Sequence, residues 1–141
     1  MTGTVHKFKG DWEKTFQWEG ARSRLYKNDR GNQVSETWMI GKKEGAENFA
    51  FRYYQIEEGG HSNKEQHPYD HGILVLQGSG KVLLGEETHT VSRGDIIHIP
   101  PDALHQISNS GQGPLGFLCV IPARRQKESG IVWAEEGIHF D

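Results

Sequence analysis

Between residues 48 and 122, short apolar runs alternate with tight-turn signals at regular spacing, and this pattern constrains the fold more than any other feature. Glycine, proline and asparagine lie between the runs, as they do between the strands of all-β domains. The runs are Asn48–Ile56, Gly72–Gln77, Lys81–Leu84, Thr88–Val91, Asp95–Ile99, Leu104–Asn109 and Leu115–Ile121. Seven such runs predict an all-β fold with little helix, an antiparallel β-barrel or jelly roll.

The rest of the chain is divided around this series. We predict an N-terminal arm with the first strands over residues 1–35, the barrel core over 36–122, and a C-terminal arm over 123–141 that packs on the barrel or on a dimer partner. Residues 16–19 alternate apolar and polar, as a half-buried strand does. Phe16–Trp18 and Ile131–Trp133 are difficult to bury on one small barrel, so we expect a homodimer.

Composition excludes several classes of protein. The net charge of −3 and the pI near 6.2 provide no general attraction for nucleic acid or acidic lipid, so neither is expected as a partner. No apolar run approaches the roughly 18 residues that a membrane helix needs, and no signal-peptide pattern is present near the start. One cysteine in 141 residues cannot form an intrachain disulfide, which favours a reducing compartment and predicts a cytoplasmic location.

Four of the residues near the middle of the chain suggest a metal site. Glu65 and His67 are two positions apart, so in an extended segment their side chains share a face. A turn would return His71 to them, and barrel closure would bring His105 over the same face. Three imidazoles and one carboxylate suit Mn, Fe, Ni, Co or Zn. A single histidine in a strand is more often a surface or hydrogen-bonded core residue, so spacing alone leaves both interpretations open.

The same segment resembles the cupin superfamily, in particular small single-domain bacterial cupins. The first cupin motif is Gly, five residues, His-x-His, three or four residues, Glu, six residues, Gly; the second is Gly, five residues, Pro-x-Gly, two residues, His, three residues, Asn. Both spacings are matched in full, by Gly59, Glu65, His67, His71 and Gly78, and by Gly94, Pro100, Asp102, His105 and Asn109.

The resemblance implies a divalent metal at His67, His71 and His105, with Glu65 as fourth ligand. Glu65 stands where the family usually has its first His, and His71 where it usually has Glu, so the two roles are exchanged. A related branch with His at the later position often carries manganese. Manganese or iron is therefore expected most, while Zn, Ni and Co also suit the donors. If it does not ligate, Glu65 is a candidate general base.

The resemblance also implies a function. Arg52 and Tyr54 alternate on one face of their run, and in similar cupins that face lies near the pocket, so both join Glu65 as candidate catalytic residues. We expect Phe117 and Cys119 to form an apolar pocket wall, and His98 to lie in the core or behind the metal ligands. The resemblance favours a metal-dependent enzyme of dioxygenase, isomerase or lyase type acting on a small oxygen-rich or aromatic molecule. A non-catalytic binding module is the alternative.

Overall fold

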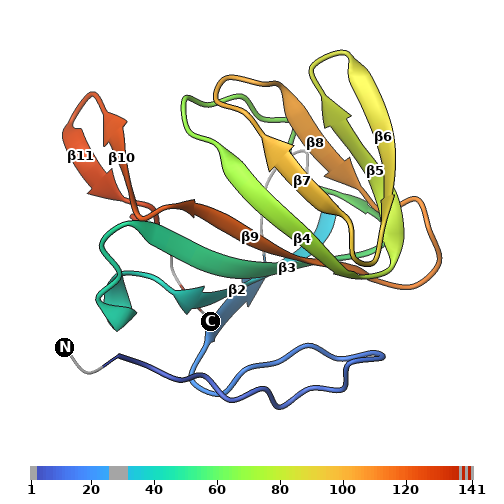
Figure 1. The fold of residues 1–141 in the computed structure, drawn as a ribbon, viewed down its shortest axis with the longest axis horizontal. Helices are drawn as coiled ribbons and strands as arrows, with labels where there is room; N and C mark the ends of the chain where they lie inside the picture. Colours follow the sequence, from blue (N-terminus) through green and yellow to red (C-terminus); the bar gives the residue numbers. More distant parts are fainter. Residues whose placement is uncertain (1–2, 26–31, 137, 139, 141) are drawn as a thin grey trace.

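A computed structural model describes residues 3–25, 32–136, 138 and 140 and is shown in Figure 1. Within these residues every paired strand is antiparallel, and the one helical segment is the 3-10 turn η1 (Lys42–Glu44). The strands are β1 (Arg22–Leu25), β2 (Asn32–Ile40), β3 (Phe49–His61), β4 (His71–Gln77), β5 (Ser79–Leu84), β6 (Glu87–Ser92), β7 (Ile96–Ile99), β8 (His105–Ser108), β9 (Leu115–Pro122), β10 (Arg124–Lys127) and β11 (Gly130–Trp133). The all-β prediction is confirmed.

Nine of these strands form one curled sheet, in which the order β6-β5-β8-β3-β9-β4-β7 is extended by β2 beside β3 and β1 beside β2 (Figure 1). The seven predicted runs correspond to β3 through β9. Strand β3 is longer than expected, because it continues through Gly59 and Gly60 to His61. That extension pairs His61 with Ser108 of β8, and Gly59 has the positive φ of 82° that glycine adopts without strain.

The inner face of the curled sheet carries the hydrophobic core. Alternate residues of the central strands point inward, as the period of two requires, and the buried set includes Val34, Ile73, Val75, Ile99, Leu115 and Phe117. Each such side chain contributes about 1.5–3 kcal/mol when it is fully buried. Charged and polar residues interrupt this face at one end, where the candidate site lies.

The N-terminal segment covers part of the outer face, and here one prediction is wrong. Residues 16–19 do not form a strand; among the described residues, the strand-type pairing within this segment consists of isolated bridges between Phe8 and Trp18 and between Asp11 and Thr15. Phe16 is nevertheless only 5% exposed, because its ring stacks on Tyr53 at 5.4 Å and 19°. Aromatic packing, rather than a strand ladder, fixes the segment.

The C-terminal residues form a separate hairpin, β10–β11, that leaves the sheet directly after β9 (Figure 1). Ile131 is 70% exposed, whereas Trp133 lies beneath the cationic groups of Lys42 and Arg124 at 5.7 and 5.3 Å. Further on, Ile138 and Phe140 pack against the core. None of the helices described is long or apolar enough to cross a membrane.

Candidate metal centre

Three histidines from two segments of the chain meet beside the inner cavity. His71 is the first residue of β4, His105 is the first residue of β8, and His67 lies in the loop before β4. One ligand atom from each ring lies within 4.8 Å of the others, and the Nε2 atoms of His67 and His71 are 2.9 Å apart. Three imidazoles at this separation suit a divalent transition metal.

Backbone contacts hold the loop that carries His67. The carbonyl of His67 accepts the N–H of Asp102 at 2.7 Å, which joins the loop to the proline corner before β8. Asp102 occupies the glycine position of the second cupin motif and has a φ of +66°. Aspartate is one of the few residues that tolerate this left-handed conformation, so the corner forms without glycine.

Hydrogen bonds orient each imidazole from behind. The Nδ1 atoms of His67 and His105 donate to the carbonyls of Tyr69 and Ala103, at 2.8 and 2.9 Å. The Nδ1 of His71 lies 3.1 Å from the Sγ of Cys119. With Nδ1 protonated, Nε2 keeps the lone pair that a metal needs. The three residues therefore fit a metal that binds through Nε2.

Burial also keeps two of the rings neutral. It lowers the pKa of His71 to about 2, with the positive charge of Arg52 and the other two histidines adding to the effect. Burial likewise lowers the pKa of His67. Both rings are unprotonated near pH 7, which is the state that coordinates a metal.

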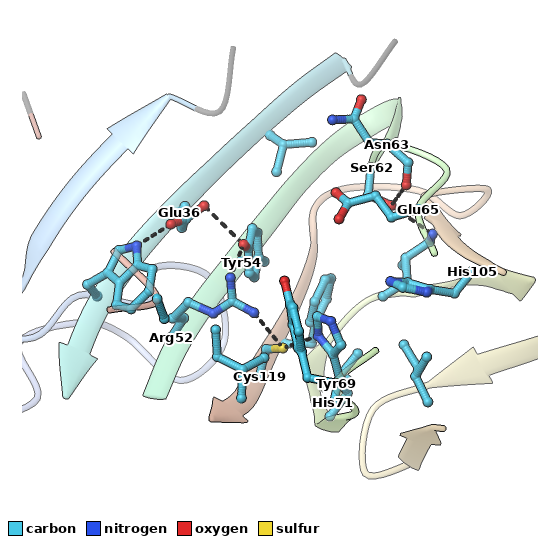
Figure 2. Close-up of a pocket in the computed structure, with 18 of the residues that line it drawn as sticks. Glu36, Arg52, Tyr54, Ser62, Asn63, Glu65, Tyr69, His71, His105 and Cys119 are labelled. Atoms are coloured by element: carbon cyan, nitrogen blue, oxygen red, sulfur yellow. Dashed lines mark hydrogen bonds between the residues drawn. The ribbon is translucent and has the colours of Figure 1, made fainter. Parts of the chain in front are cut away.

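Glu65 lies beside this cluster without being one of the three grouped residues. Its backbone N–H and carbonyl each pair with those of His105 at 2.9 Å, which ties the loop to β8. Its side chain lines the same cavity as His71 and His105 (Figure 2). Ligation by Glu65 stays a prediction, and so does its role as a base.

The cavity has a volume of about 150 Å³, and its opposite wall carries a network of charged and aromatic side chains. Figure 2 shows Arg52 and Tyr54 of β3 facing across this space, with Cys119 between Arg52 and His71. Phe117 and Cys119 both line the cavity, as their alternation in β9 predicts. The cavity thus combines a potential metal at one end with donors and a cation at the other.

The inward position of Arg52 is stabilised by partners. Its NH1 donates to the Tyr54 hydroxyl at 2.5 Å and its NH2 to Cys119 Sγ at 3.1 Å. Burial alone would lower the pKa of Arg52, but Tyr54, Cys119 and Glu36 outweigh it and the pKa is raised, so the group stays charged. Burial raises the pKa of the Cys119 thiol.

The sequence reasoning missed Glu36, which anchors this network. It is 1% exposed and accepts hydrogen bonds from Trp38 Nε1, from the Tyr54 hydroxyl at 3.0 Å and from Arg24 NH2 at 3.2 Å. The available signal was its alternation with Val34 and Trp38, which places a carboxylate on an otherwise apolar face of β2.

Tyr69 and Arg125 also line the cavity and were not singled out from the sequence.

The expectation that His98 lies in the core or behind the metal ligands is wrong. This residue lies on the exposed face of β7 and pairs with Asp70 at 3.0 Å, which lowers the pKa of that carboxyl group. The period of two in β7 explains the difference, because Ile97 and Ile99 take the inward positions.

A family model described as a cupin domain matches residues 52–121. A solved structure, a cupin 2 conserved barrel domain protein from Rhodopseudomonas palustris, is 33% identical with a TM-score of 0.70, covering 78% of this chain and 77% of that one. This chain belongs to the cupin family. The three histidines of this cupin's cluster all lie within the matched residues.

Two further matches are to sequences or structures from Rhodospirillum rubrum. This cupin is 29% identical over 117 residues to a 1-methylthio-D-xylulose 5-phosphate methylsulfurylase, covering 82% of this chain and 75% of that protein. It is also similar to the crystal structure of a cupin-2 domain protein, with 27% identity, a TM-score of 0.73, and coverage of 92% of this chain and 84% of that one.

Proposed function

We propose that this cupin is a metal-dependent enzyme acting on a small oxygen-rich or aromatic molecule. The observation that carries the proposal is that His71 and His105 of the three-histidine cluster line the same cavity as Arg52 and Tyr54. Three imidazoles, even with Glu65 added, leave positions open on a metal that prefers six ligands, which favours manganese or iron. Bound there, the metal would supply Lewis-acid or dioxygenase chemistry.

The chain's own residues would position the substrate and move a proton. The Arg52 guanidinium would attract a substrate oxygen that carries negative charge. Because Arg52 is buried away from water, this electrostatic interaction is stronger than it would be at the surface. The Tyr54 hydroxyl is held between Arg52 and Glu36 and orients a polar group of the substrate. The Glu65 carboxylate, if it does not ligate, accepts a proton.

The relatives support an enzyme. The methylsulfurylase of Rhodospirillum rubrum is named for an activity on 1-methylthio-D-xylulose 5-phosphate, a small oxygen-rich molecule. Its alignment covers 82% of this chain and 75% of that protein. A protein without metal that still binds a small ligand would instead be a binding module.

The test of the proposal is metal content together with open coordination. We expect purified protein to hold about one divalent ion per chain by plasma emission. In a cobalt-loaded sample, added oxalate should shift the visible absorption, because a chelating ligand enters the open positions. Failure to bind any divalent metal after loading contradicts the proposal, and an unshifted spectrum contradicts its catalytic part.

The Glu65→Gln variant tests the exchanged motif. We expect it to weaken metal affinity by about tenfold or more, because the amide is a poorer donor and the site loses a negative charge. Dialysis against limiting metal followed by plasma emission measures this. Glu128→Gln, at an exposed position in the β10–β11 turn, is the matched control. Metal content equal to the control would rule out ligation by Glu65 and leave the role of base.

We also propose that this cupin is a homodimer. Phe49, Ile96 and Val120 are exposed on the outer face of the sheet, and Ile96 is 80% exposed. Apolar side chains gathered on a sheet face favour association. Light scattering at micromolar concentration should give about twice the chain mass of 15.9 kDa. A mass equal to one chain would contradict the dimer.

A cytoplasmic location is proposed as well. Cys119 is a free, buried thiol, and it is the one cysteine of the chain. Free thiols are stable in reducing compartments, which supports this location.

A further inference from the structure

Arg125 of β10 is a half-buried cation that has no carboxylate partner among the ion pairs of the described residues. Its NH1 donates to the Tyr69 hydroxyl at 2.6 Å, and its NH2 makes a longer contact of 3.4 Å to the Ala134 carbonyl. Its Nε is buried without a hydrogen-bond partner. A guanidinium in this setting has donors and charge to offer a bound anion.

Tyr69 links Arg125 to the metal ligands. Its hydroxyl accepts the hydrogen bond from Arg125 and therefore keeps its own proton for a further acceptor. Its ring stacks on His67, with centroids 3.8 Å apart and planes 9° apart. An anion held by Arg125 and the Tyr69 hydroxyl would thus lie about one aromatic ring away from the three-histidine cluster.

A second hollow adjoins the cavity at these residues. Glu65, Tyr69 and Arg125 line both, and the second hollow is an open groove that also carries Lys64 and Lys127. The groove has three cationic side chains against the one carboxylate of Glu65, in a chain whose net charge is −3. This local excess of positive charge would draw an anion toward the cavity mouth.

We propose that Arg125, Tyr69, Lys64 and Lys127 form an anion subsite that binds the phosphate monoester group of the substrate. Three cations and several N–H and O–H donors match a dianion with three terminal oxygens better than they match a single carboxylate. The shared wall lets the rest of the molecule extend from the groove to His71 and His105. That the reacting end of the substrate lies at His71 and His105 rests on the proposed function. Binding of an anion at Arg125 does not, and it can be measured independently of the enzyme's activity.

The test is calorimetric titration of the metal-loaded full-length protein with inorganic phosphate. Arg125→Gln is expected to weaken phosphate binding by about tenfold to a hundredfold, because a charged hydrogen-bonding group is lost. Lys64→Gln and Lys127→Gln should each weaken it by less and reduce its salt dependence. Arg93→Gln, at an exposed position between β6 and β7, is the matched control and should bind as the wild type does.

Charge retention at position 125 and the choice of anion provide two further measurements of the subsite. Arg125→Lys, which retains the charge, should recover part of the affinity, provided that circular dichroism shows the same fold for all variants. Acetate should bind at least tenfold more weakly than phosphate; tighter binding of acetate would overturn the phosphate assignment. Equal phosphate affinity for Arg125→Gln and Arg93→Gln would overturn the subsite itself.

The His105→Ala variant separates this proposal from the metal proposal. If the subsite is correct, that variant loses metal but still binds phosphate with wild-type affinity, because Arg125 and Tyr69 are unchanged. Loss of phosphate binding together with the metal would show that phosphate binds the ion, and would overturn the subsite. Absence of metal from the wild type, with phosphate still bound through Arg125, would instead contradict the metal proposal alone.

Discussion

Replacing His71 with alanine is expected to abolish stoichiometric metal binding, and His67→Ala and His105→Ala should do the same. Each change removes one of three imidazoles whose ligand atoms lie within 4.8 Å of one another. Changes behind the ligands of metal sites typically cost 10-fold to 100-fold in affinity, so loss of a ligand should cost about 100-fold or more. Equilibrium dialysis against the metal found in the wild type, followed by plasma emission, measures the effect.

Variants at two other positions calibrate this result. His98→Ala removes an exposed histidine that pairs with Asp70, and its metal content should equal that of the wild type. Cys119→Ala removes the sulfur that lies 3.1 Å from His71 Nδ1, and it should lower the metal affinity about 10-fold to 100-fold. Cys119→Ser retains a hydrogen-bond acceptor at this position, so its metal affinity should fall by less. Wild-type metal content in all three ligand variants would show that the metal interpretation is wrong and favour the binding module.

Glu36→Ala should be the most destabilising single change in the cavity wall. Glu36 is 1% exposed, and its carboxylate accepts hydrogen bonds from Trp38, Tyr54 and Arg24. In the alanine variant these three donors lose their buried acceptor. Breaking a buried, hydrogen-bonded ion pair costs about 3–5 kcal/mol. For a domain of this size that corresponds to a fall in Tm of about 10 °C or more.

Thermal unfolding followed by circular dichroism tests this expectation. Glu36→Gln keeps the shape of the side chain and one acceptor oxygen. It should therefore lower Tm by less than Glu36→Ala does. Glu86→Gln, in the exposed turn between β5 and β6, is the control and should change Tm by no more than about 1–2 °C. If Glu36→Ala also changes Tm by no more than about 1–2 °C, the hydrogen-bond network around Glu36 contributes little to stability.

Local patterns explain why most strands were predictable. Alternation and turn residues act over a few positions, so the runs that became β4 and β9 were visible directly. The strand predicted at residues 16–19 did not form, because Phe16 instead packs on Tyr53, 37 residues away. A local sequence pattern cannot predict a contact between residues so far apart. The same limit applied to β3, whose extension past Gly59 depends on pairing with β8.

The candidate site divides in the same way. The convergence of His67 and His71 was predictable because only a turn separates them, and the spacing around His105 matched a known motif. Arg52 and Tyr54 were predictable as one face of a strand. Their partners were not, because Glu36 reaches Tyr54 through the pairing of β2 with β3, and Cys119 reaches Arg52 through the pairing of β9 with β3.

The all-β class, the turn positions and the inventory of metal donors follow from the amino-acid sequence alone, since each depends on residue type and short-range spacing. Which residues share the cavity with those donors depends on the three-dimensional fold. Cross-strand register aligns Arg52 with both Trp38 and Cys119, and the hairpin after β9 brings Arg125 to Tyr69. Register and hairpin placement result from packing between residues far apart in the chain, and burial then sets the charge state of each group.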